Sequence, residues 1–242
     1  MGFTDPIIVV GHRGAAGLAP ENTLPSFRRA YACGVSAVEL DVYQVDGELV
    51  VIHDDTLERT TNGQGPVMAQ SLEALRRLDA GGGEPVPLLA EVVAELPAGV
   101  GLNIELKGPD TAIAAAEFLA RHRGLDVVVS SFDHAELGVF RRHDAATKVA
   151  PLFSRWRPGG WQTAAALGAW GVHLAVRAAT PARLAEARRR GLATLVYTVN
   201  ELTLARRLIE LGASGVFTDY PDRITPAALA DRAPGRARSG DP

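Results

Sequence analysis

The chain has 242 residues, 47% of them hydrophobic, and a formal net charge of −3, a length that suits either two ordinary domains or one α/β barrel. The mildly acidic charge and the lack of a long basic run argue against a nucleic-acid partner. A single cysteine excludes an internal disulfide, and the apolar runs are too short for a transmembrane helix.

Short segments rich in aliphatic and β-branched residues alternate with amphipathic helical segments. Eight strands, each followed by a helix, favour an α/β fold of the (β/α)8 TIM-barrel type over an open doubly wound sheet. Glycines that follow several helices support the helix boundaries, because glycine caps helix C-termini. The predicted strands are 7–11, 37–42, 101–106, 127–131, 147–152, 171–176, 193–198 and 215–218. The predicted helices are 23–33, 88–96, 111–121, 135–142, 162–167, 181–190, 202–211 and 226–230.

The regular alternation breaks once, after the second strand. Asp46-Gly47 is a turn signal, and the apolar run 48–53 that follows it predicts a hairpin. The glycine- and proline-rich stretch from about 54 to 87 predicts a small insertion with one short helix near 71–78. Loops after barrel strands form the face where catalysis occurs, so we expect this insertion to cover part of the site.

The two ends of the chain carry little patterned structure. Residues 1–6 lack the basic region and apolar core of a signal peptide, so we expect a cytoplasmic protein without a stable membrane anchor. Residues 232–242 mix Pro, Gly, Arg and Ser and are expected to form a mobile tail. Residues 1–231 are therefore predicted to form a single barrel domain. The sequence leaves open whether the protein forms a homo-oligomer.

Acidic side chains occur on strand segments at spacings that aim them the same way. Glu39 and Asp41 are two apart and share one face of a strand, and Glu105 shares a face with Asn103 and Lys107. Three converging carboxylates repel one another unless a cation neutralises them. Oxygen ligands indicate a hard divalent metal, Mg²⁺ or Ca²⁺, while Lys107 could pair with a carboxylate or reach a substrate phosphate.

Two histidines follow strand segments at the expected catalytic face. His12 precedes Arg13, whose guanidinium suits bidentate phosphate binding. His53 precedes Asp54, which could bind the histidine or only shape a turn. Asp219 after the last strand is as consistent with a helix cap as with a site residue, and His173 on the sixth strand is interpreted as structural.

These pieces together resemble the glycerophosphodiester phosphodiesterase family, in the order that the family keeps from its first strand to its last. No single stretch is decisive, but the ordered set is specific and covers nearly the whole chain before the tail. The matching stretches are His12-Arg13-Gly14, Pro20-Glu21-Asn22-Thr23, Glu39-Leu40-Asp41-Val42, Asp46-Gly47, Val51-Ile52-His53-Asp54, 57–63, Asn103-Ile104-Glu105-Leu106-Lys107, Ser130-Ser131-Phe132, Tyr197-Thr198-Val199-Asn200 and Thr218-Asp219-Tyr220-Pro221.

The resemblance implies a barrel enzyme that hydrolyses glycerophosphodiesters to glycerol 3-phosphate and an alcohol. By correspondence with the family, Glu39, Asp41 and Glu105 are the metal ligands, and His12 and His53 are the catalytic acid–base pair. The corresponding substrate-binding positions are Arg13, Lys107, Phe132 and Tyr197. Tyr197 stands where the family commonly has Trp, which keeps an aromatic wall but adds a hydroxyl.

Several alternatives stay open at this level. His12 is assigned as the base and His53 as the acid, but the residues permit the reverse, and the nucleophile is either water or the substrate's own glycerol hydroxyl. A related phosphodiesterase acting on lysophospholipids or phosphoinositides is one rival function. A catalytically silent barrel that binds a phosphate ligand is another.

Overall fold

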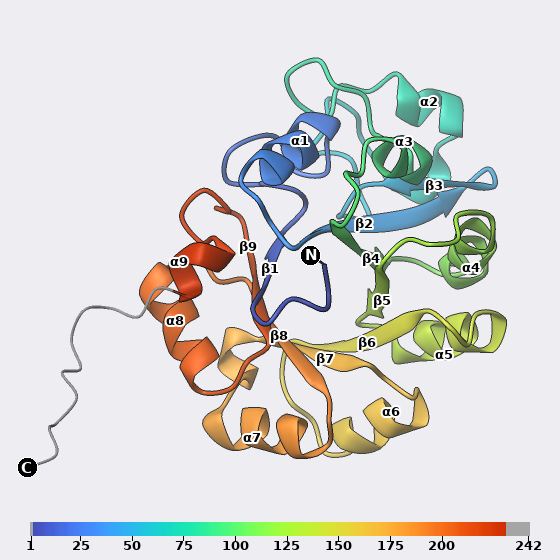
Figure 1. Ribbon diagram of the computed structural model, residues 1–242. Coiled ribbons are helices and arrows are strands. Elements are labelled where there is room, and N and C mark those ends of the chain that lie inside the picture. Colours follow the sequence, from blue (N-terminus) through green and yellow to red (C-terminus); the bar gives the residue numbers. More distant parts are fainter. Residues whose placement is uncertain (1, 231–242) are drawn as a thin grey trace, which may run out of the picture.

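A computed structural model describes residues 2–230, so the predicted tail at 232–242 lies outside the described residues (Figure 1). The predicted (β/α)8 barrel is confirmed: eight parallel strands close on one another through the pairing of the first strand with the second. Helices surround the barrel on its outside (Figure 1). The barrel strands are β1 (Ile8–Gly11), β2 (Ala37–Val45), β4 (Gly101–Leu106), β5 (Val127–Ser131), β6 (Lys148–Phe153), β7 (Gly171–Ala175), β8 (Ala193–Tyr197) and β9 (Gly215–Thr218).

The predicted helices are all present, with ends within two residues of the predicted ones. Thr23 and Thr180 are the N-caps of the helices after β1 and β7, and each accepts a hydrogen bond from a first-turn backbone N–H. Cys33 is partly exposed at the C-terminus of the first helix. The helices are α1 (Leu24–Ala32), α2 (Leu72–Arg76), α3 (Leu89–Ala94), α4 (Thr111–Arg121), α5 (His134–His143), α6 (Gly160–Ala166), α7 (Pro181–Arg189), α8 (Leu202–Glu210) and α9 (Pro226–Ala230), with the short 3₁₀ turns η1 (Val67–Ala69) and η2 (Val176–Ala178).

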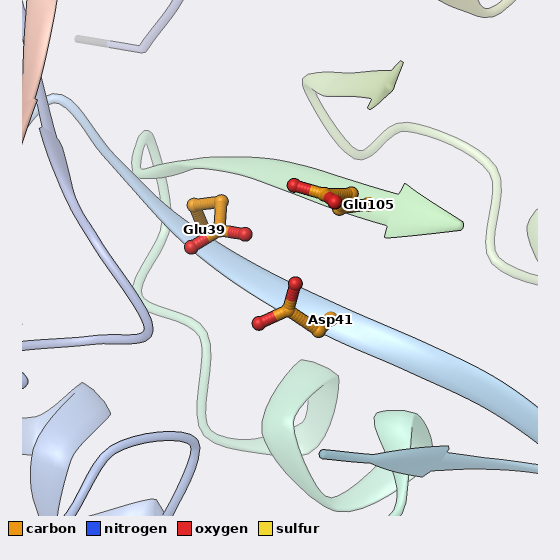
Figure 2. Close-up of side chains that lie close together, drawn as sticks. All are labelled: Glu39, Asp41 and Glu105. Carbon is orange, nitrogen blue, oxygen red and sulfur yellow. The ribbon is translucent and has the colours of Figure 1, made fainter. Parts of the chain in front are cut away.

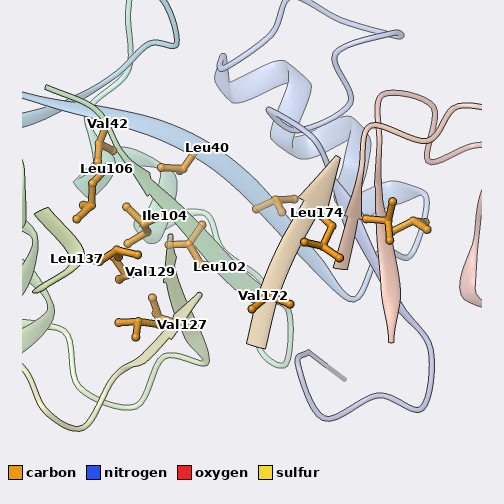
Figure 3. Close-up of a cluster of buried hydrophobic side chains, with 14 of the residues drawn as sticks. Leu40, Val42, Leu102, Ile104, Leu106, Val127, Val129, Leu137, Val172 and Leu174 are labelled. Carbon is orange, nitrogen blue, oxygen red and sulfur yellow. The ribbon is translucent and has the colours of Figure 1, made fainter. Parts of the chain in front are cut away.

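Strand parity divides the buried side chains between the two sides of the barrel wall. Leu40 on β2 and Ile104 on β4 face outward and pack with the surrounding helices in the main apolar cluster (Figure 3). A second group, which includes Val128, Leu195 and Phe217, fills the interior. The intervening positions on β2 and β4 therefore face inward, and these are the positions that carry the acidic residues.

The predicted hairpin is also present. β2 runs three residues beyond its predicted end because it continues to the Asp46-Gly47 turn and pairs antiparallel with β3 (Glu48–Val51). The segment after β3 contains η1 and α2 and buries its own apolar cluster against Tyr43 and Val50. The Asp46 carboxylate accepts a 2.7 Å hydrogen bond from the backbone N–H of Leu72, which attaches α2 to the hairpin turn.

Candidate active site

Three carboxylates meet inside the barrel near the C-terminal ends of β2 and β4. Glu39 and Asp41 project from β2, and the parallel register places Asp41 directly beside Glu105 of β4. One oxygen from each of the three lies within 4.8 Å of the others. Figure 2 shows Glu39, Asp41 and Glu105 turned toward a common point between the two strands. The prediction that these acids converge is confirmed, because the register of two neighbouring strands brings them together.

These carboxylates are almost fully removed from water, and this burial dominates their titration. Burial, with the charges of Asp41 and Glu105, raises the pKa of Glu39 well above its usual value. Burial and Asp41 raise the pKa of Glu105 to about 7. Burial would also raise the pKa of Asp41, but Lys107, His53 and Arg13 stabilise its charged form and lower that pKa. Without a further cation, the three buried carboxylates cannot all be ionised without strong mutual repulsion.

Two cationic side chains partly balance the acids. Lys107 Nζ lies 3.2 Å from Asp41 Oδ1 and also contacts Glu105, so in this structure it pairs with carboxylates, one of the two roles that the sequence left open. Arg13 Nε lies 3.5 Å from Asp41 Oδ2, and the Arg13 backbone N–H donates to Glu39 at 2.8 Å. Asp41 Oδ1 and Glu105 Oε1 are nevertheless buried without a well-oriented hydrogen bond. Oxygen atoms in this condition suit a divalent cation as a partner.

His12 follows β1 and is held by Asp219, which the sequence left open as either a helix cap or a site residue. Its Nδ1 lies 2.6 Å from Asp219 Oδ1, just after β9, which settles Asp219 as a partner of His12. The amide of Asn200 donates to the other Asp219 oxygen at 2.7 Å and accepts from the Asp219 backbone N–H. With Nδ1 engaged, Nε2 faces the acids, 4.0 Å from Glu39. This geometry leaves Nε2 free for proton transfer.

His53 has the same kind of partner, supplied by its neighbour in sequence. Its Nδ1 lies 2.6 Å from Asp54 Oδ1, so Asp54 binds the histidine. Arg59 donates to Asp54 and also to Glu21 in the loop after β1, and Glu21 accepts from Arg13 as well. This network ties the segment after β3 to the first loop. Burial lowers the pKa of His53, although Asp41 opposes that change.

The residues converge on a cavity of about 220 Å³. Phe132 and Tyr197 form one wall, with their rings edge to face at a centroid distance of 5.9 Å. Lys107 Nζ lies 5.8 Å from the Phe132 ring. Each of the nine residues proposed from sequence lines this cavity or, like Asp41 and Lys107, contacts a residue that does.

Tertiary structure adds other residues to this region. His173 of β7 was interpreted as structural, yet its buried ring lines the cavity, 5.0 Å from the ring of Phe217. Neither ring nitrogen has a hydrogen-bond partner among residues 2–230, and burial lowers the pKa of His173 to about 3. Asn22 donates to Asp41 at 2.9 Å, so it supports the carboxylate trio. Strand parity could have placed His173 inward, whereas nothing in the local sequence reveals the hydrogen bond from Asn22 to Asp41.

Comparisons with known proteins show which proteins this chain is similar to. A sequence model of the Glycerophosphoryl diester phosphodiesterase family matches residues 12–223. A glycerophosphodiester phosphodiesterase from Caldanaerobacter subterraneus subsp. tengcongensis is 33% identical over 239 residues, covering 90% of this chain and 96% of that protein. One from Bacillus subtilis is 32% identical, covering 90% and 85%. The structure of an Oleispira antarctica phosphodiesterase in complex with the product sn-glycerol-3-phosphate has a TM-score of 0.86 at 32% identity, covering 93% of this chain and 97% of that chain.

Proposed function

This chain belongs to the glycerophosphoryl diester phosphodiesterase family and is a glycerophosphodiester phosphodiesterase; on that premise we propose that a divalent metal and two histidines carry out its reaction. The proposed metal ligands are Glu39, Asp41 and Glu105, and the proposed acid–base pair is His12 and His53. The products are glycerol 3-phosphate and the alcohol of the headgroup.

The observation that carries this proposal is the balance of buried charge. When all three carboxylates are ionised, they exceed the two cations Arg13 and Lys107 by one negative charge, and Arg13 also pairs with Glu21 outside the trio. A divalent ion would offset this excess, favour the ionised form of the buried acids and reduce their repulsion of an anionic phosphodiester. Mg²⁺ and Ca²⁺ both accept carboxylate oxygens, and the donor set fits either.

The metal would supply electrostatic stabilisation of the charge that gathers on the phosphoryl oxygens. Arg13 would bind another phosphoryl oxygen; its guanidinium lies at the cavity beside the carboxylates, which supports this role. Lys107 would turn toward the phosphate once its two carboxylate partners have a stronger cation. Phe132 and Tyr197 would pack against the apolar atoms of the substrate.

Each histidine has its Nδ1 fixed by a carboxylate, which leaves Nε2 to exchange a proton with substrate. We assign His12 as the base that activates the nucleophile and His53 as the acid that protonates the leaving alkoxide. The lowered pKa of His53 in the substrate-free protein favours the opposite order, so the two roles require a direct test. The nucleophile is water or the glycerol hydroxyl of the substrate, and the second route passes through a cyclic phosphate.

Release of glycerol 3-phosphate from glycerophosphocholine tests the function. We expect turnover with Mg²⁺ or Ca²⁺ and its loss in EDTA, with recovery after the metal is returned. Turnover that survives exhaustive chelation would contradict the metal assignment. Lysophosphatidylcholine, assayed in parallel, tests the rival acylated substrate.

Among residues 2–230, no helix has the length and apolar composition needed to cross a bilayer.

A further inference from the structure

A second cavity adjoins the active-site cavity and has no role in the mechanism above. Its volume is about 390 Å³, and Phe132 and Leu152 line both cavities. Phe132 is 46% exposed at the boundary between them. The remaining wall comes from the end of β6, α5, the loop 154–159 and the first half of α6. A substrate that extends from the phosphate past Phe132 would therefore enter this second cavity.

The second cavity is electropositive. Arg155 and Arg157 lie on its wall, and none of the side chains that line it is acidic. Neither guanidinium forms an ion pair with an acidic side chain in the part of the chain that the structure describes. Arg177 donates to the carbonyl oxygen of Ser154 in the same loop, at 2.7 Å, and adds a third positive charge nearby. Unpaired guanidinium groups on a concave surface suit an anionic ligand.

The aromatic rings of this cavity do not offer a cation site. Lys107 Nζ already lies 5.8 Å from the Phe132 ring. The Phe153 ring packs against His134 at 4.9 Å and Trp156 at 4.8 Å. A quaternary ammonium group requires open aromatic faces or acidic side chains. A choline headgroup would instead meet two arginines, so its positive charge is disfavoured here.

We propose that this second cavity binds the leaving-group alcohol of the substrate and selects one that carries a phosphate monoester. Arg155 and Arg157 would bind that terminal phosphate, while the reacting phosphodiester lies at the carboxylates and Arg13. The inference rests on the proposed function and specifies its substrate class. The arginines would act on substrate affinity, because they contact a group that does not change charge in the reaction.

The test compares three substrates: glycerophosphocholine, glycerophosphoglycerol, and glycerophosphoglycerol with a phosphate on its free terminal hydroxyl. We expect kcat/KM to be at least about tenfold higher for the phosphorylated compound than for glycerophosphoglycerol, the scale of one charge-assisted hydrogen bond. The double substitution Arg155→Gln and Arg157→Gln should abolish that preference by raising KM, and should leave kcat/KM for glycerophosphoglycerol within about twofold.

The matched control is Arg188→Gln with Arg189→Gln, which removes the same charge from exposed positions at the end of α7. It should keep the preference for the phosphorylated substrate. Three results would overturn the inference. They are equal kcat/KM for the two glycerophosphoglycerol compounds, a preference for glycerophosphocholine, and a preference for the phosphorylated substrate that survives in the Arg155/Arg157 variant. Those results would still show hydrolysis, whereas failure to cleave any of the three substrates would overturn the proposed function itself.

Discussion

His12 Nδ1 lies 2.6 Å from Asp219 Oδ1, although 207 positions separate the two residues in the chain. The contact depends on barrel closure, because β1 and β9 are neighbouring parallel strands and both residues follow their C-terminal ends. The Asp219 carboxylate accepts a hydrogen bond from Nδ1, which fixes the orientation of the ring and leaves Nε2 facing the carboxylate trio. Asp219 is therefore a positioning residue for His12.

Asp219→Asn is expected to lower kcat by at least about 10- to 100-fold, by analogy with carboxylates that orient metal-ligating histidines. KM should change little, because Asp219 is not expected to touch substrate. The exposed Asp222, changed to Asn, is the control. A normal kcat in Asp219→Asn, or a loss that falls on KM instead of kcat, would disprove the positioning role.

His12→Ala and His53→Ala should each lose at least about a hundredfold in kcat, the usual scale for acid–base groups. A glycerophosphodiester with a p-nitrophenol leaving group separates the two roles, because this leaving group departs without protonation. The defect of the variant that lacks the acid should shrink on that substrate, and we expect this for His53→Ala.

The control for both variants is His143→Ala, an exposed position on α5, which should retain full activity. Near-wild-type turnover by either His12→Ala or His53→Ala would rule out an acid–base role for that residue. If the defect of His12→Ala shrinks on the substrate with the p-nitrophenol leaving group and the defect of His53→Ala does not, the two roles are reversed.

Added Mg²⁺ or Ca²⁺ should raise Tm, because a ligand that binds only the folded state stabilises it by about 2.7 kcal/mol at a hundredfold excess over Kd. For a chain of this size, that corresponds to a shift of roughly 5–10 °C. Glu105→Gln should reduce or remove the shift because it deletes one carboxylate of the trio. Glu117→Gln, at an exposed position on α4, should keep it. Equal shifts in both variants would argue against ligation by Glu105.

His173 should make the folded protein sensitive to acid. Burial lowers its pKa to about 3, whereas the unfolded chain takes up the proton near the ordinary value of about 6.5. The unfolded state therefore binds more protons between these values, and the free energy of unfolding falls as pH decreases from 6.5 toward 3. At pH 5 the loss from this residue is on the order of 2 kcal/mol.

His173→Leu should remove that part of the pH dependence, measured by urea unfolding at pH 7.5 and pH 5. The exposed His143, changed to Leu, serves as the reference and should keep the wild-type difference between the two pH values. If His173→Leu shows the same difference as wild type, the residue does not stay neutral in the folded protein.

Much of the fold was predictable because strand and helix periodicities are local. Alternation along 37–42 and 101–106 predicted that Glu39, Asp41 and Glu105 face away from their apolar neighbours, and the structure places them so. The hairpin after β2 was predictable from Asp46-Gly47, since both residues adopt positive φ there.

Other features required the closed barrel. Asp219 was equally consistent with a helix cap and with a site residue, and Arg59 was named only within the matching stretch 57–63. In the structure Asp219 contacts His12, and Arg59 donates to Asp54, the partner of His53. Parity placed His173 on one of two faces but could not tell how deep it lies or whether a neighbour would satisfy its ring.

The strand–helix alternation, the inward faces of the strands and the family could all be inferred from the amino-acid sequence alone, because they depend on spacing and on short motifs in a fixed order. Three-dimensional structure was needed to show which carboxylate supports which histidine and where a second cavity adjoins the first. Those relationships depend on distances between segments far apart in the chain. Barrel closure and strand register set such distances, and neither is encoded in any single stretch.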